Sequence, residues 1–172
     1  MAEKISLAAL NALAQNEFVE IVGPVFEHSP WIAKMTWVAK PFASVARLHA
    51  ALAETVKFSG EEKQLALIRA HPDLVGRAAL AGTLTRASTN EQAGAGLNQL
   101  SPAEILLFQK NNAAYQAKFD FPFVICARRN KQEAILAGFE ARLKNTRGQE
   151  IKTALEEIFK IAELRLRDLI RE

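Results

Sequence analysis

A histidine beside a proline is the first residue in this chain whose type suits acid–base chemistry. His71 stands in the run Ala70-His71-Pro72-Asp73-Leu74, directly after an apolar segment with helical periodicity. Because Pro72 disfavours the α region for the residue before it, we expect the helix to end at His71. An imidazole titrates near neutral pH and can transfer protons there. Local sequence alone favours a simpler interpretation, in which His71 caps the last carbonyls of that helix.

A polar segment with the chemistry of a helix start follows. Ser88 and Glu91 fit the S-x-x-E capping box, which predicts a helix over about 89–97 and explains both residues structurally. A helix N-terminus also presents free N–H groups and a positive dipole end, so it can bind an anion. In that interpretation Glu91 and Gln92 face the ligand. The glycines that follow match neither G-x-G-x-x-G nor a phosphate-loop pattern, so the segment indicates no nucleotide.

Near the C-terminus, Arg165 has a planar, forked guanidinium and a place on its helix from which the side chain can point inward. A guanidinium matches carboxylate and ureido-type oxygens in planar geometry. Arg165 lies four residues after Ile161 and can extend the apolar stripe of its helix, whereas Arg167 lies off that stripe. The alternative is a solvated face of alternating charges. Cys126 and Tyr115 are both expected to be packing residues.

The elements that must position these residues are helices. Ala, Leu, Glu, Lys and Gln are plentiful, and apolar residues recur three or four apart. Capping patterns place helix starts at Ser59, Ser88 and Ser101, with looser patterns at Asn130 and Thr146. The predicted helices span about 6–14, 17–26, 44–56, 60–70, 89–97, 102–118, 131–145 and 147–171, with a short helical stretch between Pro30 and Pro41.

One apolar segment, over about 121–127, breaks the helical pattern and contains a proline. We expect it to be extended between two helices. Because one strand cannot form a sheet alone, we predict an all-α, single-domain bundle of about eight to nine helices with this one short extended segment.

Composition narrows the class of protein. The chain has 172 residues, 49% of them hydrophobic and 24% charged, which suits one globular domain over residues 1–172. One cysteine excludes an internal disulfide, and three isolated histidines give no zinc pattern, so we expect no metal. No apolar run reaches the roughly 18 residues of a membrane span, and no signal-peptide pattern occurs, so we expect a cytoplasmic protein without a membrane partner. The net charge of +3 permits anionic substrates without demanding nucleic acid.

Taken in order along the chain, these segments resemble one known family. The resemblance rests on His71-Pro72-Asp73-Leu74, on Ser88-x-x-Glu91-Gln92 with Ala95-Gly96-Leu97, on Asn111-x-x-x-Tyr115, on the run from Lys118 to Arg128, and on the run from Ile161 to Leu166. Together they are similar to the 2-oxo-4-hydroxy-4-carboxy-5-ureidoimidazoline (OHCU) decarboxylases over nearly the whole chain. One departure is Asp120, which stands at a turn where that family usually has glycine.

The resemblance implies a helical bundle, usually a homodimer, that acts as a carboxy-lyase in urate degradation. It converts OHCU to (S)-allantoin and carbon dioxide without a cofactor. The family's catalytic histidine, glutamate and arginine correspond to His71, Glu91 and Arg165. The resemblance also implies substrate contacts at Pro72, Ser88, Thr89, Asn90, Glu91 and Gln92, and at backbone groups of Phe123, Val124, Ile125, Cys126 and Ala127.

The chemistry of OHCU agrees with these roles. Loss of carbon dioxide leaves electrons on the carbon that carried the carboxylate, and the adjacent C=N accepts them, so the substrate is its own electron sink. We expect His71 to transfer a proton and Glu91 to orient it or to hold the ureido N–H groups; the order of the proton transfers stays open. Two alternatives are a hydrolase or isomerase of a related ureido-heterocycle and, less favoured, a non-enzymatic helical module.

Overall fold

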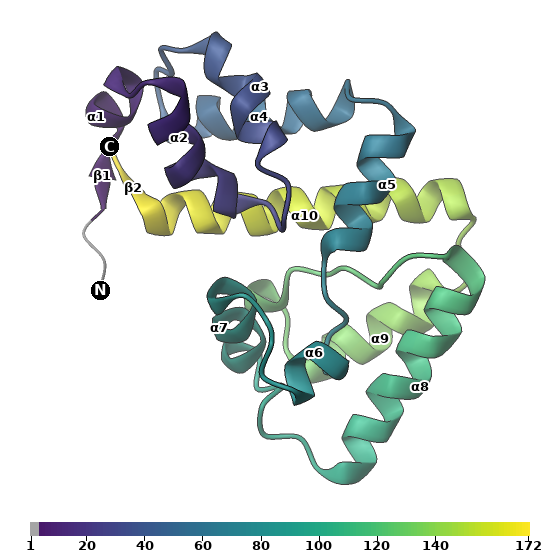
Figure 1. Ribbon diagram of the computed structural model, residues 1–172. Coiled ribbons are helices and arrows are strands. Elements are labelled where there is room, and N and C mark those ends of the chain that lie inside the picture. The colour runs from purple at the N-terminus through teal and green to yellow at the C-terminus, as the bar shows by residue number, and fades with distance from the viewer. Residues whose placement is uncertain (1–3) are drawn as a thin grey trace. The chain divides into compact units, whose positions relative to one another are not determined.

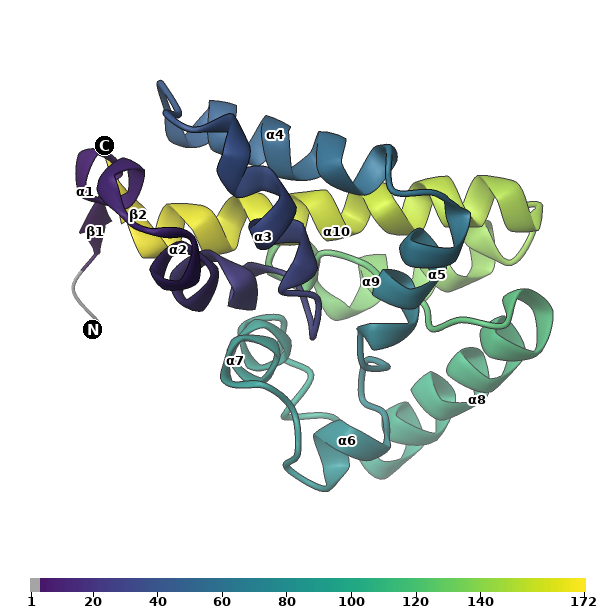
Figure 2. The same cartoon turned by 45° about the horizontal axis from the view of Figure 1, so that its top comes forward.

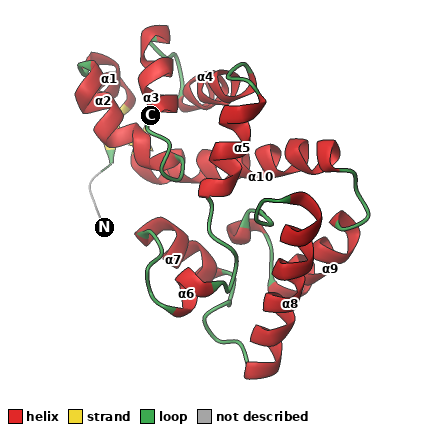
Figure 3. Ribbon diagram, turned by 45° about the vertical axis from the view of Figure 1, so that its right-hand side comes forward, coloured by secondary structure: helices red, strands yellow, loops and turns green. Residues whose placement is uncertain are grey.

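Helices make up nearly all the regular structure in the computed structural model, which describes residues 4–172 (Figure 1, Figure 3). The α-helices are α1 (Leu7–Ala12), α2 (Gln15–Val22), α3 (Trp31–Thr36), α4 (Val45–Lys57), α5 (Glu61–Ala70), α6 (Arg77–Leu80), α7 (Arg86–Gly94), α8 (Pro102–Phe119), α9 (Gln132–Arg142) and α10 (Arg147–Leu169). The 3-10 helices are η1 (Gly23–Val25), η2 (Trp37–Ala39) and η3 (Ala127–Arg129). The predicted all-α class is confirmed. The four residues of α6 were not predicted, because so short a helix shows no period of 3.6.

A small parallel sheet joins the two ends of the described chain. Strand β1 (Ile5–Ser6) pairs with β2 (Ile170–Arg171), with Ile5 opposite Ile170. The sequence predicted helix from Ser6 onward. Ser6 does serve α1, since its side chain accepts a hydrogen bond from the Ala9 N–H at 3.2 Å. Strands of two residues are too short for apolar alternation to reveal them.

Two of the predicted helix starts are confirmed atom by atom. At α8, the Ser101 hydroxyl accepts from the Glu104 N–H at 3.3 Å, and the Glu104 carboxylate accepts from the Ser101 N–H at 2.7 Å. Thr146 and Gln149 exchange the same pair of bonds before α10, at 3.3 and 2.8 Å. Each pair satisfies two backbone donors that the helix cannot use itself.

Two other helices, α5 and α9, begin within one residue of their predicted starts, but the predicted capping residues are wrong. The Ser59 hydroxyl donates to the Val56 carbonyl, near the end of the helix before it. Asn130 donates its side-chain amide to the Cys126 carbonyl, and no side chain caps α9. Short polar side chains bond either to preceding carbonyls or to following N–H groups, and the sequence pattern does not distinguish the two choices.

The described chain forms two compact units. The first contains residues 4–70 and 159–172, and the second contains residues 71–158, so α10 contributes to both. In the first unit α3 packs against α2 and α4 (Figure 2), and its buried side chains include Phe18, Ile32, Leu48 and Leu52. The single domain predicted for residues 1–172 stays a prediction, and its residues 1–3 lie outside the described part.

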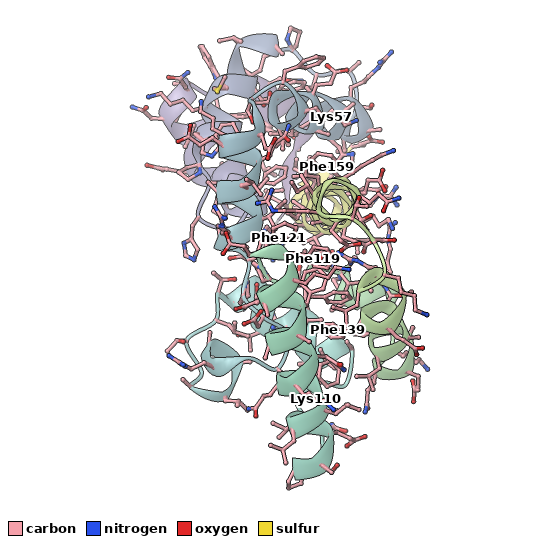
Figure 4. The ribbon with its side chains drawn as sticks, turned by 90° about the vertical axis from the view of Figure 1, so that its right-hand side faces the viewer. Lys57, Lys110, Phe119, Phe121, Phe139 and Phe159 are labelled. Carbon is pink, nitrogen blue, oxygen red and sulfur yellow. The ribbon has the colours of Figure 1, made fainter. Side chains whose placement is uncertain are left out.

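An aromatic cluster forms the core of the second unit. The Tyr115 side chain on α8 is fully buried, and its ring centroid lies 4.6 Å from that of Phe119 and 5.2 Å from that of Phe123. Phe123 in turn stacks on Phe139 of α9, with 3.8 Å between ring centroids. Figure 4 shows Phe119, Phe121 and Phe139 beside α8 and α9. The prediction that Tyr115 is a packing residue is confirmed.

Asp120 turns the chain from α8 into the segment that follows. Its backbone is left-handed, with φ 63° and ψ 30°, and its N–H donates to the Gln116 carbonyl at 2.9 Å. Glycine adopts this conformation without strain, and aspartate is among the few other residues that tolerate it. The turn brings the Phe121 ring into a stacked arrangement with Phe119. The departure from glycine at this position is therefore compatible with the turn.

Candidate active site

His71 begins a tight, buried turn immediately after α5. Its side chain is 7% exposed, and the residues from Leu74 to Gly76 are also buried. Within the turn, the Gly76 N–H donates to the Asp73 carbonyl at 3.3 Å, and Val75 has a positive φ of 53°. A Cβ on Gly76 would lie 2.5 Å from the Cβ of Asp73, so this turn requires glycine there. The prediction that the helix ends before His71 is confirmed.

Three side-chain amides hold this turn in place. Gln92 of α7 accepts from the Val75 N–H at 3.1 Å, and Asn112 of α8 donates to the Leu74 carbonyl at 2.8 Å. Gln116 donates to the Asp73 carboxylate. Burial raises the pKa of Asp73, and the Gln116 hydrogen bond partly opposes that rise. The backbone after His71 is thus attached to two helices of the same unit.

Helix α7 begins earlier than the capping pattern predicted. Its N-cap is Thr85, whose hydroxyl accepts from the Ser88 N–H at 3.2 Å. Ser88 is therefore inside the first turn and buried, and the prediction that it caps the helix is wrong. Thr85 is itself a favourable N-cap residue, and it takes this position three residues before Ser88.

The side chains from Ser88 to Gln92 divide between the interior and the surface. Ser88 and Gln92, four residues apart on one face, are buried, whereas Thr89 and Asn90 are exposed. Glu91 is half-buried, and its charge contributes to the environment of Cys126. Helix α7 also packs against η3, which begins at Ala127. The structure therefore brings Glu91 and Gln92 close to both the His71 turn and the end of the 123–127 segment.

In the segment predicted to be extended over about 121–127, the residues from Pro122 to Cys126 form neither helix nor strand, and the Cys126 backbone is extended. Ala127 instead begins η3, so the predicted segment ends one residue earlier. All its residues are buried except Ile125, which is half-buried. Cys126 donates its N–H to Glu157 at 2.8 Å, and its carbonyl accepts from the Arg129 N–H at 3.0 Å. That N–H, which the resemblance suggested for substrate, is thus already bonded within the chain.

The Cys126 thiol is buried. Burial raises its pKa, the nearby carboxylates of Glu157 and Glu91 raise it further, and Arg129 opposes them. Because the thiolate is the reactive form of cysteine, this environment disfavours a nucleophile. The prediction that Cys126 is a packing residue is confirmed.

Arg165 lies on α10 in the first unit and is 8% exposed. Its Nη2 donates to the Glu27 carboxylate at 2.8 Å, and its Nη1 donates to the Val25 carbonyl at 3.3 Å. The inward direction predicted for Arg165 is confirmed, as is the exposure of Arg167. The structure thus places His71, Glu91 and the 123–127 segment in the second unit, and Arg165 in the first.

Sequence reasoning did not single out four residues that support the candidate site. Asn112 and Gln116 hold the His71 turn, while Arg142 and Glu157 hold the backbone of the 123–127 segment. One signal was present: Glu157 lies four residues before Ile161 on the buried stripe of α10, where a lone charge needs a partner.

Among residues 4–172, no three His, Cys, Asp or Glu side chains are grouped so that they could hold a metal ion. In the same range, no helix is both long enough and apolar enough to cross a membrane.

Comparison with known proteins covers the chain from Asn11 to Arg167. A family model described as OHCU decarboxylase matches residues 11–167. A 2-oxo-4-hydroxy-4-carboxy-5-ureidoimidazoline decarboxylase of Halalkalicoccus jeotgali is 42% identical over 166 residues, which are 96% of this chain and 92% of that protein. The decarboxylase of Haloferax volcanii is 40% identical over 163 residues, 95% of each chain. That of Xenopus laevis is 37% identical over 168 residues, covering 96% and 94%.

Two solved structures share the fold. A crystal structure of (S)-allantoin synthase superposes with a TM-score of 0.77 and 26% identity over 97% of this chain, which spans 54% of that longer chain. A structure of OHCU decarboxylase in the presence of (S)-allantoin gives a TM-score of 0.65 at 23% identity, covering 80% of this chain and 89% of that one. With its family model matched over residues 11–167 and with relatives that are 37–42% identical along nearly their whole lengths, the chain belongs to the OHCU decarboxylase family.

Proposed function

We propose that this chain decarboxylates OHCU to (S)-allantoin and carbon dioxide in urate degradation, without a cofactor. The chain belongs to the OHCU decarboxylase family, and the structural observation that carries the proposal is one hydrogen bond. The Val75 N–H donates to Gln92, which joins the turn that follows His71 to the helix that bears Glu91. An imidazole can return the proton that a decarboxylation needs, and a carboxylate on a joined element can orient it.

The reaction needs a proton at one face of a carbon. When the C–C bond to the carboxylate breaks, carbon dioxide leaves and the electron pair moves into the adjacent C=N of the ring. That ring nitrogen takes up a proton. A second proton adds to the ureido-bearing carbon while the neighbouring hydroxyl releases its proton and becomes the ring carbonyl, which gives allantoin. We assign the proton transfer to His71, because an imidazole that is 7% exposed delivers a proton from one direction. Protonation from one side yields the single (S) enantiomer, whereas the spontaneous reaction yields a racemate.

The remaining residues bind and orient the substrate in this proposal. Glu91 orients His71 or accepts from the ureido N–H groups, and Pro72 and the residues from Ser88 to Gln92 surround the ring. Backbone groups between Phe123 and Ala127 bind ring oxygens and N–H groups. Arg165 binds the carboxylate or ureido oxygens, since a guanidinium that Glu27 keeps aligned presents its donors in a planar fork.

The proposal also includes a homodimer in the cytoplasm and no nucleic-acid partner. The family resemblance supports the dimer, which size-exclusion chromatography with light scattering tests, and cell fractionation tests the location. Arg167 pairs with Glu163 at 2.7 Å, which breaks up any basic stripe at the end of α10. Steeply salt-dependent binding to DNA would contradict this part of the proposal.

The deciding experiment follows the chirality of allantoin by circular dichroism. Urate is oxidised and hydrolysed in situ to fresh OHCU, with and without the protein. The wild-type chain should give a rapid (S) signal, and His71→Ala should lower the rate by about 100-fold or more. His49→Ala is the matched control, because His49 bonds the Phe159 carbonyl and has no proposed role in catalysis.

Three outcomes separate the parts of the proposal. A wild-type chain that only follows the slow racemic course would contradict the decarboxylase function. A fully active His71→Ala would contradict the role of His71 alone. A His71→Ala variant whose far-ultraviolet spectrum shows unfolding would instead support the interpretation of His71 as a helix cap.

A further inference from the structure

Two buried charges of opposite sign hold the extended segment at alternate residues. Arg142 of α9 donates from Nη1 to the Val124 carbonyl at 2.6 Å. Glu157 of α10 accepts from the Cys126 N–H at 2.8 Å. The two residues are 9% and 8% exposed. The backbone on either side of Ile125 is therefore bonded to charged groups from two different helices.

Charged groups are a costly choice for this task. Burying a charge is unfavourable unless it is paired and hydrogen-bonded, and a neutral amide side chain could satisfy either backbone group. Charge-assisted hydrogen bonds are shorter and stronger than neutral ones, so they restrict backbone movement more tightly. The use of two such bonds on one short coil indicates that its exact backbone position matters beyond stability.

The position of Arg142 is itself determined by a buried network. Its Nε donates to Glu150 at 2.9 Å, and Asn145 donates to the other oxygen of that carboxylate at 2.7 Å. Tyr115 also donates to Glu150. The guanidinium lies 4.3 Å from the centre of the Phe123 ring, in cation–π contact. These contacts with residues of α8 and α10 fix the Arg142 side chain on α9. Arg142 in turn fixes the position of the Val124 carbonyl.

Ile125, between the two held residues, is the most exposed residue of the segment from Phe121 to Cys126. It is half-buried while its neighbours are buried, and its backbone N–H has no hydrogen-bond partner within residues 4–172. On its other side, a Cβ on Gly138 would lie 3.6 Å from the Ile125 side chain and 3.4 Å from Phe123. A side chain at this position of α9 would therefore touch the segment.

We propose that Arg142 and Glu157 are positioning residues, which hold the backbone from Val124 to Cys126 so that the Ile125 N–H donates to an oxygen of the substrate in one orientation. This inference rests on the proposed function. It assigns no proton transfer to either side chain. Both act on the reaction through the segment, by fixing which face of the ring is presented to the proton donor.

The test compares Glu157→Gln with Glu157→Met. The glutamine carbonyl can still accept from the Cys126 N–H, whereas methionine fills a similar volume and cannot. We expect Glu157→Gln to stay close to wild type, and Glu157→Met to raise KM and lower kcat/KM by about tenfold or more. Ser101→Ala, which loses a helix cap elsewhere in the same unit, is the control for a general loss of stability.

Enantiomeric purity gives a second readout that a purely structural role would not change. Enzyme concentrations are adjusted so that all variants give the same initial rate, which makes the contribution of the spontaneous racemic reaction equal. Under these conditions we expect Glu157→Met to produce allantoin of lower enantiomeric purity, while Ser101→Ala and Glu157→Gln match the wild-type chain.

The outcomes keep this inference separate from the proposed function. A wild-type chain without decarboxylase activity would contradict the function itself. An active wild-type chain with an unchanged KM and unchanged purity in folded Glu157→Met would overturn the positioning role. If Glu157→Met does not fold, Arg142→Lys decides, because lysine keeps the charge and loses the planar fork; unchanged values in that variant would overturn the inference.

Discussion

Tyr115, the one tyrosine of the chain, makes the stability of the second unit sensitive to alkaline pH. Its hydroxyl donates to the buried Glu150 carboxylate and accepts from Arg142 Nη2 at 3.3 Å. Burial raises the pKa of this hydroxyl well above its ordinary value of 10.0, the Glu150 carboxylate adds to the rise, and Arg142 opposes it. Tyr115→Phe removes only the hydroxyl and leaves the aromatic packing in place.

At neutral pH we expect Tyr115→Phe to lower the free energy of unfolding by about 1.5–3 kcal/mol. That is the usual contribution of a hydrogen bond to a charged group. The lower end of this range is the better guide, because Glu150 keeps its bonds to Arg142 and Asn145. No cavity forms, so no further loss is expected from packing.

The pH dependence follows from the direction of the pKa shift. Below pH 10 both the folded and the unfolded chain keep the proton on Tyr115, so its contribution to stability is fully present. Above pH 10 the unfolded chain releases that proton while the folded chain retains it. The free energy of unfolding should then fall by about 1.4 kcal/mol per pH unit from this group alone.

Urea unfolding at a series of pH values from about 8 to 11 measures this loss. All other ionisable groups are the same in both proteins, so the difference between wild type and Tyr115→Phe isolates the tyrosine. Tyrosinate absorbance should rise together with unfolding in the wild-type chain. Parallel stability curves for the two proteins, or a tyrosinate signal in the folded state near pH 10, would refute the reasoning.

Two further predictions concern the elements that hold the candidate site. Thr85→Ala should lower the free energy of unfolding by about 1 kcal/mol, measured by urea unfolding, because Thr85 caps α7; an unchanged value would mean that the cap contributes nothing. Gly76→Ala should reduce kcat/KM more than it reduces thermal stability, because the added Cβ would lie 2.5 Å from Asp73 and shift the turn that follows His71. Full activity in that variant would show that the turn tolerates movement.

Local patterns predicted much of the fold, and their failures have local causes. The longest helices, α8 and α10, have both a capping box and a long apolar period, and both were placed within a few residues. Ser59 and Ser88 have the same capping pattern and do not cap the helices predicted for them. A hydroxyl has several backbone groups within reach, and only the surrounding structure selects one of them.

The candidate site was predicted by residue type and by family resemblance rather than by spacing. His71, Glu91 and Arg165 each have a complete structural explanation when considered alone. The sequence did not show which residues hold the turn after His71. Three side chains do so, and they are common polar residues at ordinary helix positions: Gln92, Asn112 and Gln116. Their roles exist only once α7 and α8 pack beside the turn.

The sequence by itself determined the helical class, the extended segment and the family, because each depends on periodicity or on residue order along the chain. Only the tertiary structure decided which charges are buried against which backbone groups. Cys126 and Glu157 are 31 residues apart, and Val124 and Arg142 are 18 apart. Such pairs form only when separate helices pack together, and a local sequence pattern does not predict that packing. Each charged side chain, considered alone, is equally compatible with a solvated helix face.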